Sequence, residues 1–203
     1  MTEEEARERV VAQVGGAAAD RLGKLADLVA EENQRQNLVA PASLSVIWQR
    51  HILDSTQLLA FAPDRWAQWV DIGTGGGFPG LAVAAVSDAP VMLVEPRKRR
   101  AAFLTDAAAR LGLRNVSVQP CRVEQVSASA DVVSARAVAS IEKLLLAARG
   151  CATTDTTWIL PRGRSTDEEL ALIRGDWEGL FHVKRSTTDP DSVIVVARGV
   201  TRR

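Results

Sequence analysis

The chain has 203 residues, of which 46% are hydrophobic and 25% are charged, and its formal net charge is zero. This ordinary globular composition excludes overall disorder, and the charge balance argues against a protein that coats nucleic acid by bulk charge. The acidic start, residues 1–7, argues against a secretory signal. Two cysteines, Cys121 and Cys151, make no disulfide framework, so we expect a cytoplasmic protein.

The N-terminal third predicts helices. Apolar residues recur at helical spacing within residues 2–36, as Leu22, Leu25, Leu28 and Val29 illustrate. Residues 43–60 predict a second helix that Ser43 caps and that ends before Pro63. We expect residues 1–60 to form a helical cap on a larger domain, residues 61–203.

The rest of the chain alternates between strands and helices. Seven strands are expected, and helices are expected between most of them. The strands are residues 69–72, 91–94, 116–118, 131–135, 158–160, 181–185 and 193–197, and the helices start near residue 79 and cover 97–111, 140–148 and 167–174. This order predicts an α/β, Rossmann-like fold with a mostly parallel sheet. Residues 186–192 are too few for a helical crossover, so the last two strands should form an antiparallel hairpin.

A glycine-rich loop, residues 71–80, joins the first predicted strand to a helix. The loop formally matches the dinucleotide fingerprint, with Glu95 20 residues after Gly75. It also matches the loop of S-adenosylmethionine (AdoMet) methyltransferases. Asp71 favours AdoMet, because a carboxylate at the strand end repels a pyrophosphate but attracts an ammonium. The antiparallel hairpin that closes the sheet, and the lack of room for the substrate domain of a dehydrogenase, also favour AdoMet over a dinucleotide.

Two acids and a basic run flank this loop. Glu95 ends the second strand, where a carboxylate accepts hydrogen bonds from ribose hydroxyls. Glu124 follows the third strand, where methyltransferases contact the adenine edge. The run Arg97–Arg100 would face RNA or form a solvated basic surface.

Five segments resemble the RsmG (GidB) family of bacterial methyltransferases, which modify N7 of a guanine in 16S ribosomal RNA. They are Asn37-Leu38, Arg50-His-Ile-Leu-Asp-Ser55, Asp71 to Gly80, Arg122-Val-Glu124 and Ser134-Ala-Arg136-Ala. The resemblance covers roughly residues 25 to 198. The segment that contains Arg50 and His51, ahead of the glycine loop, is the most specific part.

The resemblance implies a cofactor and its site. AdoMet would contact the glycine loop and the ends of the next strands, through Asp71, Gly73, Thr74, Gly75, Gly77, Phe78, Glu95, Val123, Glu124 and Arg136. The target guanine and the methionine end would lie near Asn37, His51, Arg122 and Arg136. The family usually has Lys-Gly after the fifth strand, whereas this chain has Arg162-Gly163, so a role for Arg162 on RNA or substrate is a hypothesis.

The acceptor atom is also suggested by what the chain lacks. Ser134-Ala-Arg136 stands where amino-group methyltransferases carry an Asn/Asp-Pro-Pro motif. Guanine N7 has a free lone pair, so its methylation requires alignment rather than a general base. The two histidines and two cysteines are scattered and predict no metal site.

We therefore expect a monomeric AdoMet-dependent 16S rRNA (guanine-N7)-methyltransferase whose partner is 16S rRNA or the assembling small subunit, with no membrane partner. A nicotinamide-dependent oxidoreductase and a non-catalytic AdoMet-binding RNA-associated protein are the alternatives.

Overall fold

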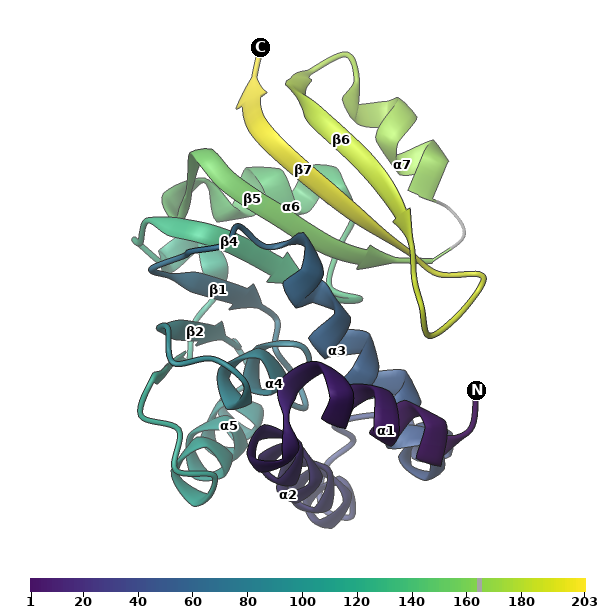
Figure 1. The fold of residues 1–203 in the computed structure, drawn as a ribbon. Helices are drawn as coiled ribbons and strands as arrows, with labels where there is room; N and C mark the ends of the chain where they lie inside the picture. The colour runs from purple at the N-terminus through teal and green to yellow at the C-terminus, as the bar shows by residue number, and fades with distance from the viewer. Residues whose placement is uncertain (164–165) are drawn as a thin grey trace.

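The computed structural model describes residues 1–163 and 166–203. Its centre is a seven-stranded sheet in the order β3-β2-β1-β4-β5-β7-β6 (Figure 1). The strands are β1 (Trp69–Ile72), β2 (Val91–Val94), β3 (Val116–Gln119), β4 (Ala130–Ala135), β5 (Ala152–Arg162), β6 (Trp177–Arg185) and β7 (Val193–Arg202). β1 to β5 pair in parallel, and β7 runs antiparallel between β5 and β6. The predicted α/β fold and its closing hairpin are confirmed.

Both faces of the sheet are buried, and alternate strand residues divide between two hydrophobic cores. Trp69, on β1, packs with helices on one face, whereas Val70 packs with helices on the other. Ile159 and Leu160, on β5, divide in the same way. This arrangement follows from the period of two along a strand.

The first core joins the N-terminal helices to α4 (Gly80–Ala85) and α5 (Lys98–Arg110). The second lies between the sheet and α6 (Ile141–Ala147) and α7 (Thr166–Ile173). Because the first core contains residues from both sides of residue 60, the N-terminal helices pack directly on the sheet. The division into a cap, residues 1–60, and a domain, residues 61–203, stays a prediction.

The N-terminal helix is broken, which corrects the prediction of one helix over residues 2–36. α1 covers Glu3–Val14 and α2 covers Gly16–Asn33. Gly15, between them, has φ of +81°, in a region that glycine enters without steric cost. α1 can then fold back and bury Ala6 and Val10.

The segment predicted as one helix over residues 43–60 is helical throughout residues 41–61, but its hydrogen-bonding pattern changes along its length; we call residues 41–61 the cap segment. It contains a 3₁₀ helix (Pro41–Val46), a π-helix (Trp48–Leu53), α3 (Asp54–Thr56) and a second 3₁₀ helix (Gln57–Phe61). Ser43 lies inside the first turn and does not cap a helix. The Glu3 carboxylate accepts hydrogen bonds from the backbone N–H groups of Trp48 and Gln49, at 2.9 and 3.0 Å, and so holds the start of the π-helix.

The hairpin loop, residues 186–192 between β6 and β7, is attached to the cap segment (Figure 1). The hydroxyl of Thr188 donates to Asp54 at 2.7 Å, and Arg50 forms an ion pair of 2.6 Å with Asp189. Gln49 donates to the Thr188 carbonyl at 2.9 Å. The last two strands therefore help to position the segment that carries His51.

The last three strands are longer than predicted. β5 begins at Ala152 rather than residue 158, because polar residues that the sequence suggests as a loop pair with β4 after a bulge. Thr156, for example, is fully buried and donates to the Ala130 carbonyl. β6 begins at Trp177, which pairs with Arg202 at the far end of β7.

Candidate functional site

The glycine loop connects β1 to α4 and is held from beneath by Asp71. This carboxylate has no exposed surface. It accepts hydrogen bonds from Gly80 N at 3.1 Å and from the Ser134 hydroxyl at 2.6 Å, so it joins the end of the loop to β4. Asp71 is covered by protein, and its direct contact with a methionine ammonium stays a prediction.

The burial of Asp71 also shifts its pKa. Desolvation raises the pKa of Asp71 to about 6, against the opposing effect of the hydrogen bonds from Ser134 and Gly80. A carboxylate in this position stabilises the loop through those two donors rather than through a charge presented to a ligand.

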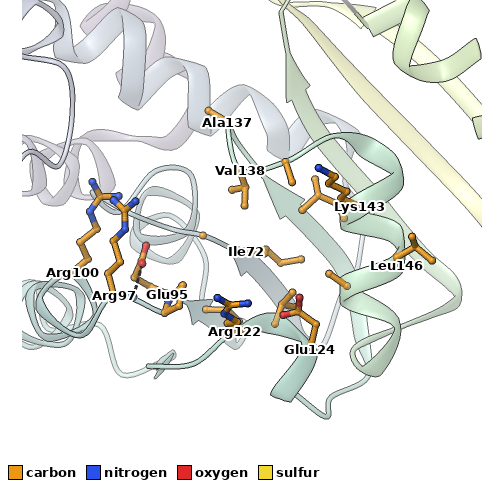
Figure 2. Close-up of a pocket in the computed structure, with 17 residues that line it drawn as sticks. Ile72, Glu95, Arg97, Arg100, Arg122, Glu124, Ala137, Val138, Lys143 and Leu146 are labelled. Carbon is orange, nitrogen blue, oxygen red and sulfur yellow. Dashed lines mark hydrogen bonds between the residues drawn. The ribbon is translucent and has the colours of Figure 1, made fainter. Parts of the chain in front are cut away.

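Glu95, at the end of β2, holds the middle of the same loop. Its Oε2 accepts a hydrogen bond from Gly75 N at 3.0 Å, and its Oε1 accepts one from Arg97 N at 2.9 Å. The side chain is only 3% exposed, yet it lines a cavity, as Figure 2 shows. Each carboxylate oxygen has two lone pairs, so Glu95 retains capacity to accept hydrogen bonds from a ligand.

This first cavity has a volume of about 820 Å³ and opens along the carboxyl ends of the strands. Ile72 forms its floor, with Glu95 and Arg97 on one side and Leu146 on the other (Figure 2). Its volume is in the range that small-molecule and cofactor sites occupy. Among the predicted cofactor residues, those that line it are Gly73, Glu95, Val123 and Glu124.

The other predicted cofactor residues lie outside its lining. Thr74, Gly75, Gly77 and Phe78 are buried within or beneath the loop. Thr74 donates to the carbonyl of Asp71 at 3.1 Å, so it stabilises the turn itself. Arg136 lines a different cavity.

Gly73 explains why a glycine stands where the loop meets the cavity. Its φ is +67°, and a Cβ built on it would lie 2.6 Å from a methyl carbon of Val138. Val138 belongs to the segment after β4 and lies above the cavity (Figure 2). Any side chain at position 73 would therefore separate two walls of the cavity.

A second cavity, of about 460 Å³, lies between the cap segment, the ends of β4 and β5, and the hairpin loop. Arg136 is the centre of its hydrogen bonds. Its guanidinium donates to the Asp54 carboxylate and to the Arg50 carbonyl, both at 3.1 Å, and to His51 Nδ1 at 2.9 Å. The structure thus brings Arg136 and His51 together.

His51 has both ring nitrogens in hydrogen bonds. The Ser43 hydroxyl donates to the Ala40 carbonyl at 2.7 Å, so its oxygen accepts from His51 Nε2–H at 2.7 Å. Nδ1 then accepts from Arg136, which defines a neutral ring. Burial lowers the pKa of His51 to about 3, and the charges of Arg136 and Arg50 contribute. This ring, stacked on Phe78 at 5.1 Å, positions Arg136 and is not a free base.

The neutral His51 predicts a pH dependence of stability. The pKa of His51 is lower in the folded protein than its ordinary value of 6.5. Below pH 6.5 the unfolded chain therefore binds more protons at this residue than the folded protein does. The free energy of unfolding should therefore fall on acidification, by about 2 kcal/mol between about pH 7.5 and about pH 5 from this residue. Urea unfolding of the parent and of His51→Asn is measured at both pH values. Both proteins contain Asp71, so the difference between them isolates the contribution of His51 to the pH dependence of stability. An equal change in the two proteins would contradict the assignment of a neutral His51.

Ala137 separates the two cavities and lines both of them. It has φ of +55° and is the one non-glycine residue with positive φ among residues 1–163 and 166–203. Side chains rarely adopt this conformation, and such residues concentrate at functional sites. The backbone at Ala137 is therefore the boundary across which a group in one cavity would meet a group in the other.

Two predicted residues lie apart from Arg136 and His51. Asn37 is exposed after α2, and its carbonyl accepts a hydrogen bond from Arg100 at 2.7 Å. Arg122 is exposed and lines the first cavity. The structure therefore divides the predicted substrate residues between three places.

The structure adds residues that the sequence analysis missed. Lys143 and Val138 line the first cavity, and Glu169 lines the second. Arg162 also lines the second cavity, where it donates to the Ala139 carbonyl at 2.8 Å. Asp54, three residues after His51 in the family-like segment, pairs with Arg136. Glu169 is contributed by α7, and no sequence motif pointed to it.

Within the described part of the chain, no group of three His, Cys, Asp or Glu side chains is placed to hold a metal ion. No helix of that part combines the length and apolar character that crossing a membrane requires.

Known proteins match the chain over nearly its whole length. The family model described as "GidB: rRNA small subunit methyltransferase G" matches residues 18–188. A protein of Erythrobacter litoralis named "Ribosomal RNA small subunit methyltransferase G" is 45% identical over 200 residues, which are 98% of this chain and 97% of that protein. A protein of the same name from Novosphingobium aromaticivorans is 45% identical over 204 residues, 98% of this chain and 89% of its own.

A solved structure shares the fold at low sequence identity. A "SAM dependent methyltransferase from Aquifex aeolicus" superposes with a TM-score of 0.61 and 14% identity, over 83% of this chain and 97% of that one. The architecture is therefore that of AdoMet-dependent methyltransferases. From its family match and its relatives, this chain belongs to the rRNA small subunit methyltransferase G family of methyltransferases.

Proposed function

We propose that this protein transfers a methyl group from AdoMet to N7 of a guanine in 16S ribosomal RNA of the small subunit. The observation that carries the proposal is the match to relatives named for small-subunit ribosomal RNA, over 98% of the chain. The two cavities that meet at Ala137 support it, because a methyl donor and an acceptor base need adjacent spaces.

The first cavity fits AdoMet. Glu95 offers acceptor capacity at the wall where ribose hydroxyls would lie, and a glycine at position 73 leaves the backbone open beside it. We assign Gly73, Glu95, Val123 and Glu124 to direct contact, and Asp71, Thr74, Gly75, Gly77 and Phe78 to support of the loop. When bound, AdoMet supplies an electrophilic methyl group on a sulfonium.

The second cavity fits an acceptor that needs no proton removed. His51 is neutral with both nitrogens in hydrogen bonds, and the Asp54 carboxylate is paired with Arg136. Guanine N7 carries a free lone pair that attacks the methyl group, and the positive charge passes from the sulfonium to the base. Arg136 therefore needs only to donate to the base and orient it. This chemistry requires no metal ion and no covalent intermediate.

Mass spectrometry of nucleosides tests the proposal. Small-subunit RNA from cells without the protein is incubated with purified protein and tritiated AdoMet, and 7-methylguanosine should carry the label. A label on another nucleoside would contradict N7 as the acceptor. Binding of AdoMet without transfer would favour the non-catalytic alternative, and binding of a nicotinamide cofactor instead would favour an oxidoreductase.

We keep the cytoplasmic location and the monomeric state of this protein as predictions.

The basic residues at the start of α5 are the proposed contact with RNA phosphates. Lys98 and Arg99 are exposed and lie outside both cavities, whereas Arg97 and Arg100 line the first. Arg99 also donates to the Arg35 carbonyl at 3.2 Å, which brings a further arginine to this surface. With zero net charge on the chain, this local cluster would have to supply much of the phosphate binding.

Reversing the charges of Lys98 and Arg99 together should weaken RNA binding without changing AdoMet binding. We expect a slope of log affinity against log salt of about −2 to −4 for the parent, and a shallower slope for the double variant Lys98→Glu, Arg99→Glu, because fewer phosphates are neutralised. The double variant Arg149→Glu, Arg174→Glu makes the same charge change at exposed positions elsewhere and should keep the parental slope. Equal slopes in all three proteins would show that RNA docks elsewhere.

A further inference from the structure

The carboxylates that line the second cavity differ in their free hydrogen-bonding capacity. Asp54 accepts from Gln57 and Thr188 through Oδ1, at 2.9 and 2.7 Å, and from Arg136 through Oδ2. Glu169 accepts from Ile141 N at 2.9 Å through Oε2. Its Oε1 has no hydrogen bond within residues 1–163 and 166–203. Glu169 therefore brings an unused acceptor to the cavity wall.

Arg162 places a positive charge in the same wall. Its Nη1 donates to Ala139, but its Nε and Nη2 are buried and have no partner among the residues that the structure describes. Burial lowers the pKa of Arg162, and the charge of Glu169 acts in the opposite direction. The wall thus holds unused donors beside an unused acceptor. Because the two nitrogens are covered, a ligand would contact Glu169 more directly than Arg162.

This combination has the polarity of the Watson–Crick edge of guanine. That edge presents N1–H and the N2 amine as donors, and a carboxylate accepts from both. Adenine presents an acceptor at N1, which a carboxylate repels. N7 lies on the opposite edge of the purine, so a base held at Glu169 could direct N7 toward Ala137 and the first cavity.

We propose that Glu169 selects guanine by accepting hydrogen bonds from N1–H and the N2 amine of the acceptor base. The proposal rests on the proposed function, since it names the residue that recognises the same substrate. Glu169 is then a specificity-determining residue contributed by α7, an element that carries none of the residues implied by the family resemblance.

Inosine provides the test, because it lacks only the N2 amine of guanine. The guanine that the parent protein methylates is first mapped, and a ligated small-subunit RNA is prepared with inosine at that position. The parent should methylate the guanine RNA at least about 10-fold faster in kcat/KM than the inosine RNA. Glu169→Gln should lose about 10- to 100-fold on guanine and show a guanine-to-inosine ratio near one, because its amide can offer a donor where an acceptor is needed.

Glu168→Gln is the matched control. Glu168 is exposed on the same helix, lies outside the cavity lining and loses the same charge, so it should keep the parental rate and ratio. The amide oxygen of Glu169→Gln can still accept from Ile141 N, and the midpoint of urea unfolding checks that the variant is folded.

Two results would overturn the inference. One is a parent protein that methylates the inosine RNA as fast as the guanine RNA, which requires no variant. The other is a folded Glu169→Gln protein that keeps the parental ratio. If the parent places no methyl group on any guanine N7, the proposed function fails instead, so the two failures are distinguishable.

Discussion

Replacing Arg136 with alanine is expected to reduce methyl transfer at saturating AdoMet by about 100-fold or more. Arg136 is the cationic group of the second cavity that contacts the cap segment in three places, through Asp54, His51 and the Arg50 carbonyl. A donor that is already oriented before the reaction contributes on this scale when it aligns the acceptor base with the methyl group. Single-turnover transfer to small-subunit RNA measures the loss.

The same change should lower stability by about 1–3 kcal/mol, because a partly buried Asp54 loses its ionic partner. Arg136→Lys keeps a positive charge but not the planar guanidinium, so it should recover stability more than rate. Arg198→Ala removes an exposed arginine from β7 and should leave transfer at the parental level. A folded Arg136→Ala protein with parental turnover would remove Arg136 from the site.

Replacing Glu95 with alanine is expected to raise the dissociation constant of AdoMet about 100-fold. The carboxylate fixes Gly75 N and Arg97 N on one wall of the first cavity, and it would also accept from the ribose. The variant loses charge-assisted hydrogen bonds and leaves two backbone donors without their partner. Isothermal titration calorimetry with AdoMet measures the change directly.

Glu95→Gln retains one oxygen and should lie between the parent and the alanine variant. Asp106→Ala, on the exposed side of α5, removes a carboxylate that does not line the cavity and should bind AdoMet as the parent does. Unchanged affinity in Glu95→Ala would contradict the assignment of the first cavity to the cofactor.

The sequence predicted β1 to β4 within one residue at each end, because strands buried on both faces are short apolar runs. The cap segment was harder to predict. Its apolar spacing is helical, but its geometry depends on Glu3 holding Trp48 and Gln49 from another helix. The break at Gly15 was open to prediction from the glycine pair, whereas the length of β5 depends on pairing with distant strands.

The glycine loop could be located from sequence, but the direction of its side chains could not. Asp71 turns beneath the loop because Ser134, from another strand, donates to it. Phe78 packs against His51 for a similar reason, since the cap segment lies over the loop. Spacing in the chain predicts which strand ends carry polar residues, and tertiary packing decides which cavity each side chain reaches.

The attachment of the hairpin loop to the cap segment has a consequence for how the protein matures on the ribosome. Thr188 and Asp54, which hold each other beside Arg136, are separated by 134 residues in the chain. Contacts of such long range form slowly, because closing a long loop of chain costs entropy. All residues that line the first cavity precede β5, whereas the second cavity is also lined by Ser186, Ser192 and Val193. The protein therefore gains its second cavity only after β7 has been synthesised and has inserted beside β5.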